Sequence, residues 1–177
     1  DLYAATIDWD LGWGNFISAT GYTDMTTENR QDSPINYGEF TQVLGLEDPG
    51  SSYFDLGLDF QKFSQEFRLA SKDDGPFDWM TGFFYTKEEG NQTQDLYLNQ
   101  LDGSPLTPPF DEVAGLLAAL EIPTEYKETA FFANGGYRFN DLFKLSAGIR
   151  FSENDQNFSQ NVTGGLLLPI GETPNSS

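Results

Sequence analysis

Three short turns, each flanked by residues that alternate between apolar and polar, constrain this chain more than any other feature of its sequence. The turns lie at residues 12–15, 73–76 and 140–142. An alternation with period two predicts β-strands that each have one apolar face. A short turn between two such strands predicts an antiparallel hairpin. We therefore expect an all-β chain with about six strands in three hairpins.

The alternation also gives approximate boundaries. The expected strands cover residues 2–11, 16–30, 53–71, 77–89, 126–140 and 143–155, and the expected loops cover residues 31–52, 90–124 and 156–177. In the third strand the apolar phase reverses near Gln61, which predicts a β-bulge or a strand that projects beyond its neighbours.

One short helix is expected within residues 90–124. Pro108 and Pro109 would open it, Asp111 and Glu112 would lie in its first turn, and Pro123 would end it. Its apolar stripe would consist of Phe110, Val113, Leu117 and Leu120. The helix would be either a loop element that packs on itself or a mobile lid.

Aromatic residues gather around the short turns. An aromatic girdle at one level of many strands is typical of transmembrane β-barrels, whose apolar strand faces contact lipid. We therefore expect an antiparallel up-and-down transmembrane β-barrel segment in the outer membrane of a Gram-negative cell. The residues expected to face lipid or to form the girdle are Trp9, Trp79, Tyr137, Phe139, Phe143, Ile149 and Phe151. The alternation would also fit a soluble sandwich or a lipocalin-like barrel.

Composition excludes several functions. The net charge of -19 argues against binding to nucleic acid, and the absence of His and Cys excludes imidazole and thiolate chemistry. The adjacent carboxylate pair Glu88 and Glu89 would point to opposite faces of a strand, so it is no acid–base pair. We expect no enzyme activity, no cofactor and no metal centre. The acidic loops are either solvated surface or a site for a divalent cation or a cationic ligand.

Several strand segments resemble TonB-dependent outer-membrane receptors, and together they cover most of the chain from Ala5 to Phe158. The segments are residues 17–22 (ISATGY), 63–71 (FSQEFRLAS), 74–79 (DGPFDW), 82–85 (GFFY), 130–133 (AFFA), 137–141 (YRFND) and 145–151 (LSAGIRF). Because six strands do not close such a barrel, we expect this chain to be an internal piece of a larger one.

The resemblance implies the remaining expectations. The family forms a barrel of about 22 strands around a plug domain that engages the TonB system, and it takes up siderophores, haem, cobalamin, nickel complexes or glycans. The partners would be outer-membrane lipid, the rest of the barrel, the plug and, through the plug, TonB. Substrate would meet the extracellular loops, which makes Tyr37, Phe40 and Tyr97 candidates by location.

Charged residues on the polar strand faces near the short turns would line the lumen. These are Glu66, Arg68, Arg138, Lys144 and Arg150. They would either contact the plug or pair with one another along the wall, for example Arg138 with Glu66.

Two other functions remain open. The chain could be a self-contained soluble or surface protein that binds a hydrophobic or glycan ligand, or mediates adhesion. Alternatively, it could be a structural hairpin assembly that closes only by oligomerising.

Overall fold

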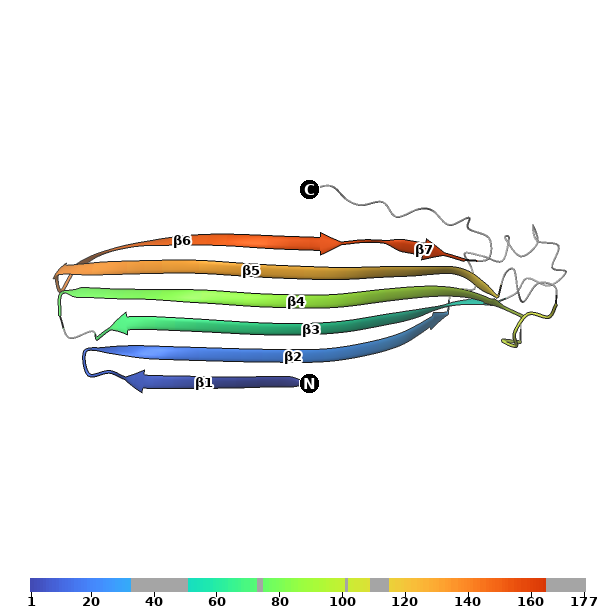
Figure 1. Ribbon diagram of the computed structural model, residues 1–177, viewed down its shortest axis with the longest axis horizontal. Coiled ribbons are helices and arrows are strands. Elements are labelled where there is room, and N and C mark those ends of the chain that lie inside the picture. Colours follow the sequence, from blue (N-terminus) through green and yellow to red (C-terminus); the bar gives the residue numbers. More distant parts are fainter. Residues whose placement is uncertain (33–50, 73–74, 101, 109–114, 165–177) are drawn as a thin grey trace. The chain divides into compact units, whose positions relative to one another are not determined.

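The computed structural model describes residues 1–32, 51–72, 75–100, 102–108 and 115–164, and these residues form a single β-sheet. The first six strands lie in the order in which they occur in the chain, and the last pairs with β5 (Figure 1). The strands are β1 (Leu2–Asp10), β2 (Gly14–Asp32), β3 (Ser51–Ser71), β4 (Phe77–Asn99), β5 (Leu116–Asn140), β6 (Phe143–Phe158) and β7 (Asn161–Thr163).

The predicted all-β, up-and-down architecture with six principal antiparallel strands is confirmed. Over the described residues the sheet is open, with β1 and β6 at its two edges. In the same part of the chain, no helix is long and apolar enough to cross a membrane.

The turns form because polar side chains and glycine satisfy their backbone groups. In the first turn, Gly12 has a φ of 85° and donates its N–H to Oδ1 of Asp10 at 2.7 Å. A left-handed φ is accessible to glycine at little cost. In the third turn, Oδ1 of Asn140 accepts the N–H groups of both Leu142 and Phe143 at 2.9 Å. Asn is a common turn former for this reason.

The predicted loop over residues 90–124 is largely wrong, because β4 continues to Asn99 and β5 begins at Leu116. Leu117, expected on a helix, is buried in β5 beside Leu96 and Leu98, and Leu120 pairs with Val162 of β7. Burial and strand pairing therefore override the helical tendency of the Leu- and Ala-rich segment. Residues 109–114, which hold the start of the expected helix, lie outside the described residues.

The phase reversal in β3 reflects a long strand and not an inserted residue. The pairing register of β3 and β4 is the same along the strands, because the two residue numbers of each facing pair add up to the same total. The pairs are Tyr53 with Tyr97, Lys62 with Glu88, and Phe67 with Phe83. An inserted residue would change that total by one. The predicted bulge near Gln61 is therefore wrong, and because β3 faces β4 from Tyr53 to Phe67 it does not project beyond this neighbour either.

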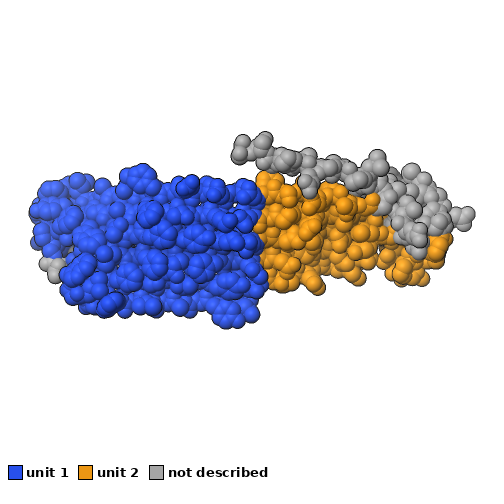
Figure 2. All heavy atoms as spheres, in the orientation of Figure 1, with its two compact units in different colours: residues 1–24, 61–89, 125–157 blue, residues 25–60, 90–124, 158–177 orange. Residues whose placement is uncertain are grey.

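The described residues divide into two compact units, coloured separately in Figure 2. Unit 1 comprises the described residues within 1–24, 61–89 and 125–157, and unit 2 comprises those within 25–60, 90–124 and 158–177. The buried apolar cluster of unit 2 contains Leu96, Leu98, Leu106 and Leu117. Among the described residues of unit 1, Ala130 is the only apolar side chain that is fully buried. Unit 1 therefore has almost no enclosed core.

Candidate functional surfaces

One face of unit 1 is apolar, and strand pairing defines where it begins. In the β1–β2 register Tyr3 lies opposite Tyr22, and Trp9 lies opposite Phe16. Residues directly opposite each other in an antiparallel pair project from the same face. The apolar face therefore starts with the odd-numbered residues of β1 and the even-numbered residues of β2.

A ladder of phenylalanine rings continues this face across four strands. Ring centroids are 6.1 Å apart between Phe16 and Phe67, 6.5 Å between Phe67 and Phe83, and 5.0 Å between Phe83 and Phe131. These spacings are those of interacting aromatic pairs. The contacts place side chains of β2, β3, β4 and β5 on one continuous surface.

The side chains of this apolar face are largely uncovered. Trp9 is 62% exposed, Phe131 is 59% exposed, and Ile149 and Phe151 on β6 are 56% and 67% exposed. A contiguous exposed apolar surface marks a site of contact with a protein, a ligand or a membrane. Unit 1 thus presents its apolar residues outward instead of enclosing them.

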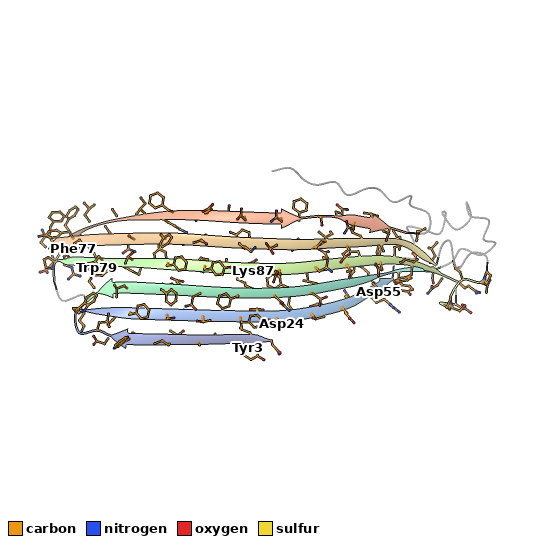
Figure 3. The ribbon with its side chains drawn as sticks, viewed as in Figure 1. Tyr3, Asp24, Asp55, Phe77, Trp79 and Lys87 are labelled. Carbon is orange, nitrogen blue, oxygen red and sulfur yellow. The ribbon has the colours of Figure 1, made fainter. Side chains whose placement is uncertain are left out.

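Aromatic residues lie at two levels of the apolar face. At the turn level, Trp13 stacks with Trp79 at 6.4 Å, and Phe139 contacts both Tyr137 and Phe143. Figure 3 labels Phe77 and Trp79 at the turn end of β4, with Lys87 farther along the strand. The second level contains the pairs Tyr3 with Tyr22 and Phe63 with Tyr85. Sequence analysis missed this second level, because those residues are close together only after the strands pair.

Beyond the second aromatic level, charged residues occupy strand positions that project from the same face. Lys87 pairs with Glu89 at 2.8 Å on β4, and Lys127 pairs with Glu125 at 2.6 Å on β5. On β4 the apolar segment from Phe77 to Tyr85 is therefore bounded by charge. At about 3.3 Å per residue it is roughly 26 Å long.

One polar cluster interrupts the apolar face, and its polar groups form hydrogen bonds with one another. Oε1 of Gln65 accepts the hydroxyl of Thr20 at 2.6 Å, and Nε2 of Gln65 donates to Oγ of Ser18 and to the carbonyl of Ala19, both at 3.1 Å. Because its donors and acceptor are used within the protein, this amide needs no water.

The opposite face of unit 1 carries ion pairs. Lys144 pairs with Asp78 at 2.7 Å, and Arg150 pairs with Glu128 at 2.7 Å. Glu66 pairs with Arg68 on its own strand, so the expected pairing of Glu66 with Arg138 is wrong. The backbone N–H of Arg138 donates to the carbonyl of Pro76 at 2.7 Å.

A shallow groove on this polar face brings together three of the five residues expected to line a lumen. Its volume is about 420 Å³, and it is lined by Glu66, Arg68, Met80, Phe84, Phe132 and Arg150. Sequence analysis missed Asp78 and Glu128, although both have the same strand parity as the cations they meet. Their partners depend on strand register, which the sequence does not specify.

Unit 2 holds a second groove, built around an arginine. Nε and Nη2 of Arg30 donate to the two carboxylate oxygens of Asp55, both at 2.7 Å. These hydrogen bonds lower the pKa of Asp55 and raise the pKa of Arg30. Tyr97, a candidate by location, lies in β4 and stacks on Tyr53 at 5.1 Å, and burial raises its pKa. Tyr37 and Phe40 lie outside the described residues.

Within the described ranges, no group of three or more His, Cys, Asp or Glu side chains is arranged to hold a metal ion. The acidic loop residues 33–50 lie outside these ranges, so a cation site there stays a prediction. Comparisons with protein-family models, curated proteins and solved structures find no match to the chain. Its function must therefore be inferred from the two faces of unit 1 and the groove of unit 2.

Proposed function

We propose that this chain is part of the wall of a β-barrel in a Gram-negative outer membrane, and that the barrel is a TonB-dependent uptake receptor. Its cargo would be a siderophore, cobalamin, haem or a glycan. The observation that carries the membrane part is the exposed apolar face of unit 1, with aromatic residues at two levels and charged residues beyond the second.

The dimensions of the apolar face support a bilayer. A transmembrane β-strand needs about 9–11 tilted residues, and an outer-membrane barrel has an apolar band about 25 Å tall between two aromatic girdles. The segment from Phe77 to Tyr85 on β4 has a similar length. A soluble sandwich would instead cover this face with a second sheet.

The stagger of the strands supports a barrel. The phenylalanine ladder starts two residues from the turn end of β2 at Phe16 and lies four residues from that of β3 at Phe67. It lies six residues from the turn end of β4 at Phe83 and nine from that of β5 at Phe131. Neighbouring strands that are progressively shifted are tilted with respect to the line of turns. Tilt and stagger are what closing a sheet into a barrel requires.

The ion-paired face supports an enclosed lumen. A barrel wall that alternates apolar and polar residues directs its polar side chains inward. The five predicted lumen residues occupy even-numbered strand positions, as the ion-paired residues of this polar face do. Their contact with a plug domain stays a prediction that depends on the family resemblance. The transport assignment depends on that resemblance alone.

The membrane assignment is tested by the solution behaviour of the chain. We expect it to aggregate in plain buffer and to become monodisperse in dodecylphosphocholine micelles, as measured by sedimentation velocity. A monodisperse monomer in plain buffer would contradict the assignment and favour a self-contained binding protein.

The transport assignment needs a separate experiment in cells. Disrupting the gene should abolish TonB-dependent uptake of one of the four cargo classes, measured with labelled ferric siderophore, cobalamin, haem and oligosaccharide. Unchanged uptake of all four would refute it while leaving the membrane assignment intact.

A further inference from the structure

A polar groove in unit 2 has the features of a ligand site. It has a volume of about 430 Å³, within the range of small-molecule sites. It is lined by Glu28, Asn29, Arg30, Asp55, Leu56, Gly57, Thr93 and Asp95. Gly57 leaves room opposite Thr93, because a Cβ at Gly57 would collide with Oγ1 of Thr93.

Arg30 makes contacts on two sides in this groove. Its guanidinium carbon lies 4.2 Å from the ring centroid of Tyr53, which in turn stacks on Tyr97. Two of its five N–H groups point to Asp55 at 2.7 Å. The other three N–H groups form a planar donor edge that needs no reorganisation to accept a ligand.

The groove also offers acceptors. Over the described part of the chain, the side chains of Glu28 and Asp95 make no hydrogen bond or ion pair, although both line the groove beside Arg30. Donors and unused acceptors therefore border the same space. A ligand that both donates and accepts hydrogen bonds would satisfy both sets.

We propose that this groove binds a saccharide, with adjacent hydroxyl oxygens accepting from Arg30 and hydroxyl groups donating to Glu28 and Asp95. An anion would be repelled, because the three carboxylates of the groove outnumber its one guanidinium. A cation could meet the carboxylates but would leave the three other N–H groups of Arg30 without acceptors, whereas a neutral polyol supplies both donors and acceptors. Its paired hydroxyls also match the planar fork of an arginine.

The proposal is independent of the membrane assignment, because every residue that carries it belongs to unit 2. Failure of sugar binding would leave the detergent requirement of the chain unchanged, so the two outcomes are distinguishable.

The test uses the full chain in deuterated dodecylphosphocholine micelles, which carry no sugar. Maltose, cellobiose and lactose are each added at millimolar concentration, and saturation-transfer NMR measures binding. Putrescine and methyl phosphate serve as cationic and anionic probes. We expect saturation transfer to at least one disaccharide and to neither charged probe.

Variants locate the site. Arg30→Lys loses the planar fork, and the resulting affinity for the disaccharide should fall about tenfold or more. Gly57→Ala should weaken binding without changing any charge. The matched control is Lys87→Arg, which exchanges the same two side chains at a residue paired at 2.8 Å with Glu89 in unit 1 and should leave affinity unchanged.

Three results would overturn the proposal. They are the absence of saturation transfer to all three disaccharides, binding of putrescine or methyl phosphate in their place, and an Arg30→Lys variant with unchanged disaccharide affinity.

Discussion

The apolar face of unit 1 makes a quantitative prediction for the substitution Ala147→Arg. Ala147 lies midway between Phe143 and Phe151 on β6, four residues from each. At about 3.3 Å per residue, the new guanidinium would start roughly 13 Å along the strand from either end of the apolar segment. An arginine side chain cannot bridge that distance to water without distortion of the surrounding lipid or detergent.

The expected cost follows from depth. Arginine on the lipid face of a barrel costs about 2–4 kcal/mol at the bilayer midplane and close to nothing near the interfaces. In dodecylphosphocholine micelles we expect the lower end of this range, because water reaches the interior of a micelle more easily. About 2 kcal/mol corresponds to roughly a thirtyfold change in the folding equilibrium.

The control is Ser146→Arg, one residue earlier at nearly the same depth. Its side chain would join the polar face beside Asp78 and Lys144, where unit 1 already carries ion pairs. We expect a cost well below that of Ala147→Arg. Urea titrations followed by the fluorescence of the tryptophans measure both free energies of unfolding. Equal costs for the two variants, or a larger cost for Ser146→Arg, would refute the assignment of the faces.

Three further substitutions test individual contacts. Thr20→Val leaves Oε1 of Gln65 without its donor and should cost about 1–3 kcal/mol, whereas the double variant with Gln65→Leu should recover most of that loss; an unimproved double variant would count against the cluster. Gly14→Ala places a Cβ 2.6 Å from the carbonyl oxygen of Ala70 and should destabilise the chain by about 1–3 kcal/mol, whereas Gly75→Ala, with open space around it, should be nearly neutral; equal urea midpoints would contradict this. Because the folded pKa of Asp55 is lowered, its pairing with Arg30 stabilises unit 2 at neutral pH, and that contribution is lost as the pH falls through the folded pKa, below about 3.9. Asp55→Asn should abolish this acid-dependent loss of stability. Near-ultraviolet circular dichroism of the tyrosines measures the acid transition of the original chain and of the variant, and identical transitions would contradict a stabilising role for the pair.

The sequence predicted well the strands whose alternation is uninterrupted. In β6, Leu145 and Ile149 alternate with Ser146 and Arg150, and the strand begins at the predicted residue, Phe143. The first and third turns were predictable for a similar reason, since Gly12 and Asn140 are residues that turns favour.

Segments whose strand character depends on partners were not predictable. Leu116 to Glu121 has the composition of a helix and extends only because it pairs with β7 and packs on the leucines of β4. The same limit applies to the functional surfaces. Arg30 and Asp55 are far apart in sequence, and only the register of β2 against β3 joins their side chains. Individual strand patterns carry little information about register between strands separated by long connections.

The central claim, that one face of unit 1 contacts the apolar phase, is tested most directly by spin-label accessibility on β6. The chain has no cysteine, so single cysteines introduced one at a time at positions 144–151 can each carry a nitroxide. In dodecylphosphocholine micelles we predict that collisions with oxygen peak at positions 145, 147, 149 and 151, and that collisions with a polar nickel chelate peak at positions 144, 146, 148 and 150. Equal accessibility along the strand, or the opposite phase, would contradict the account.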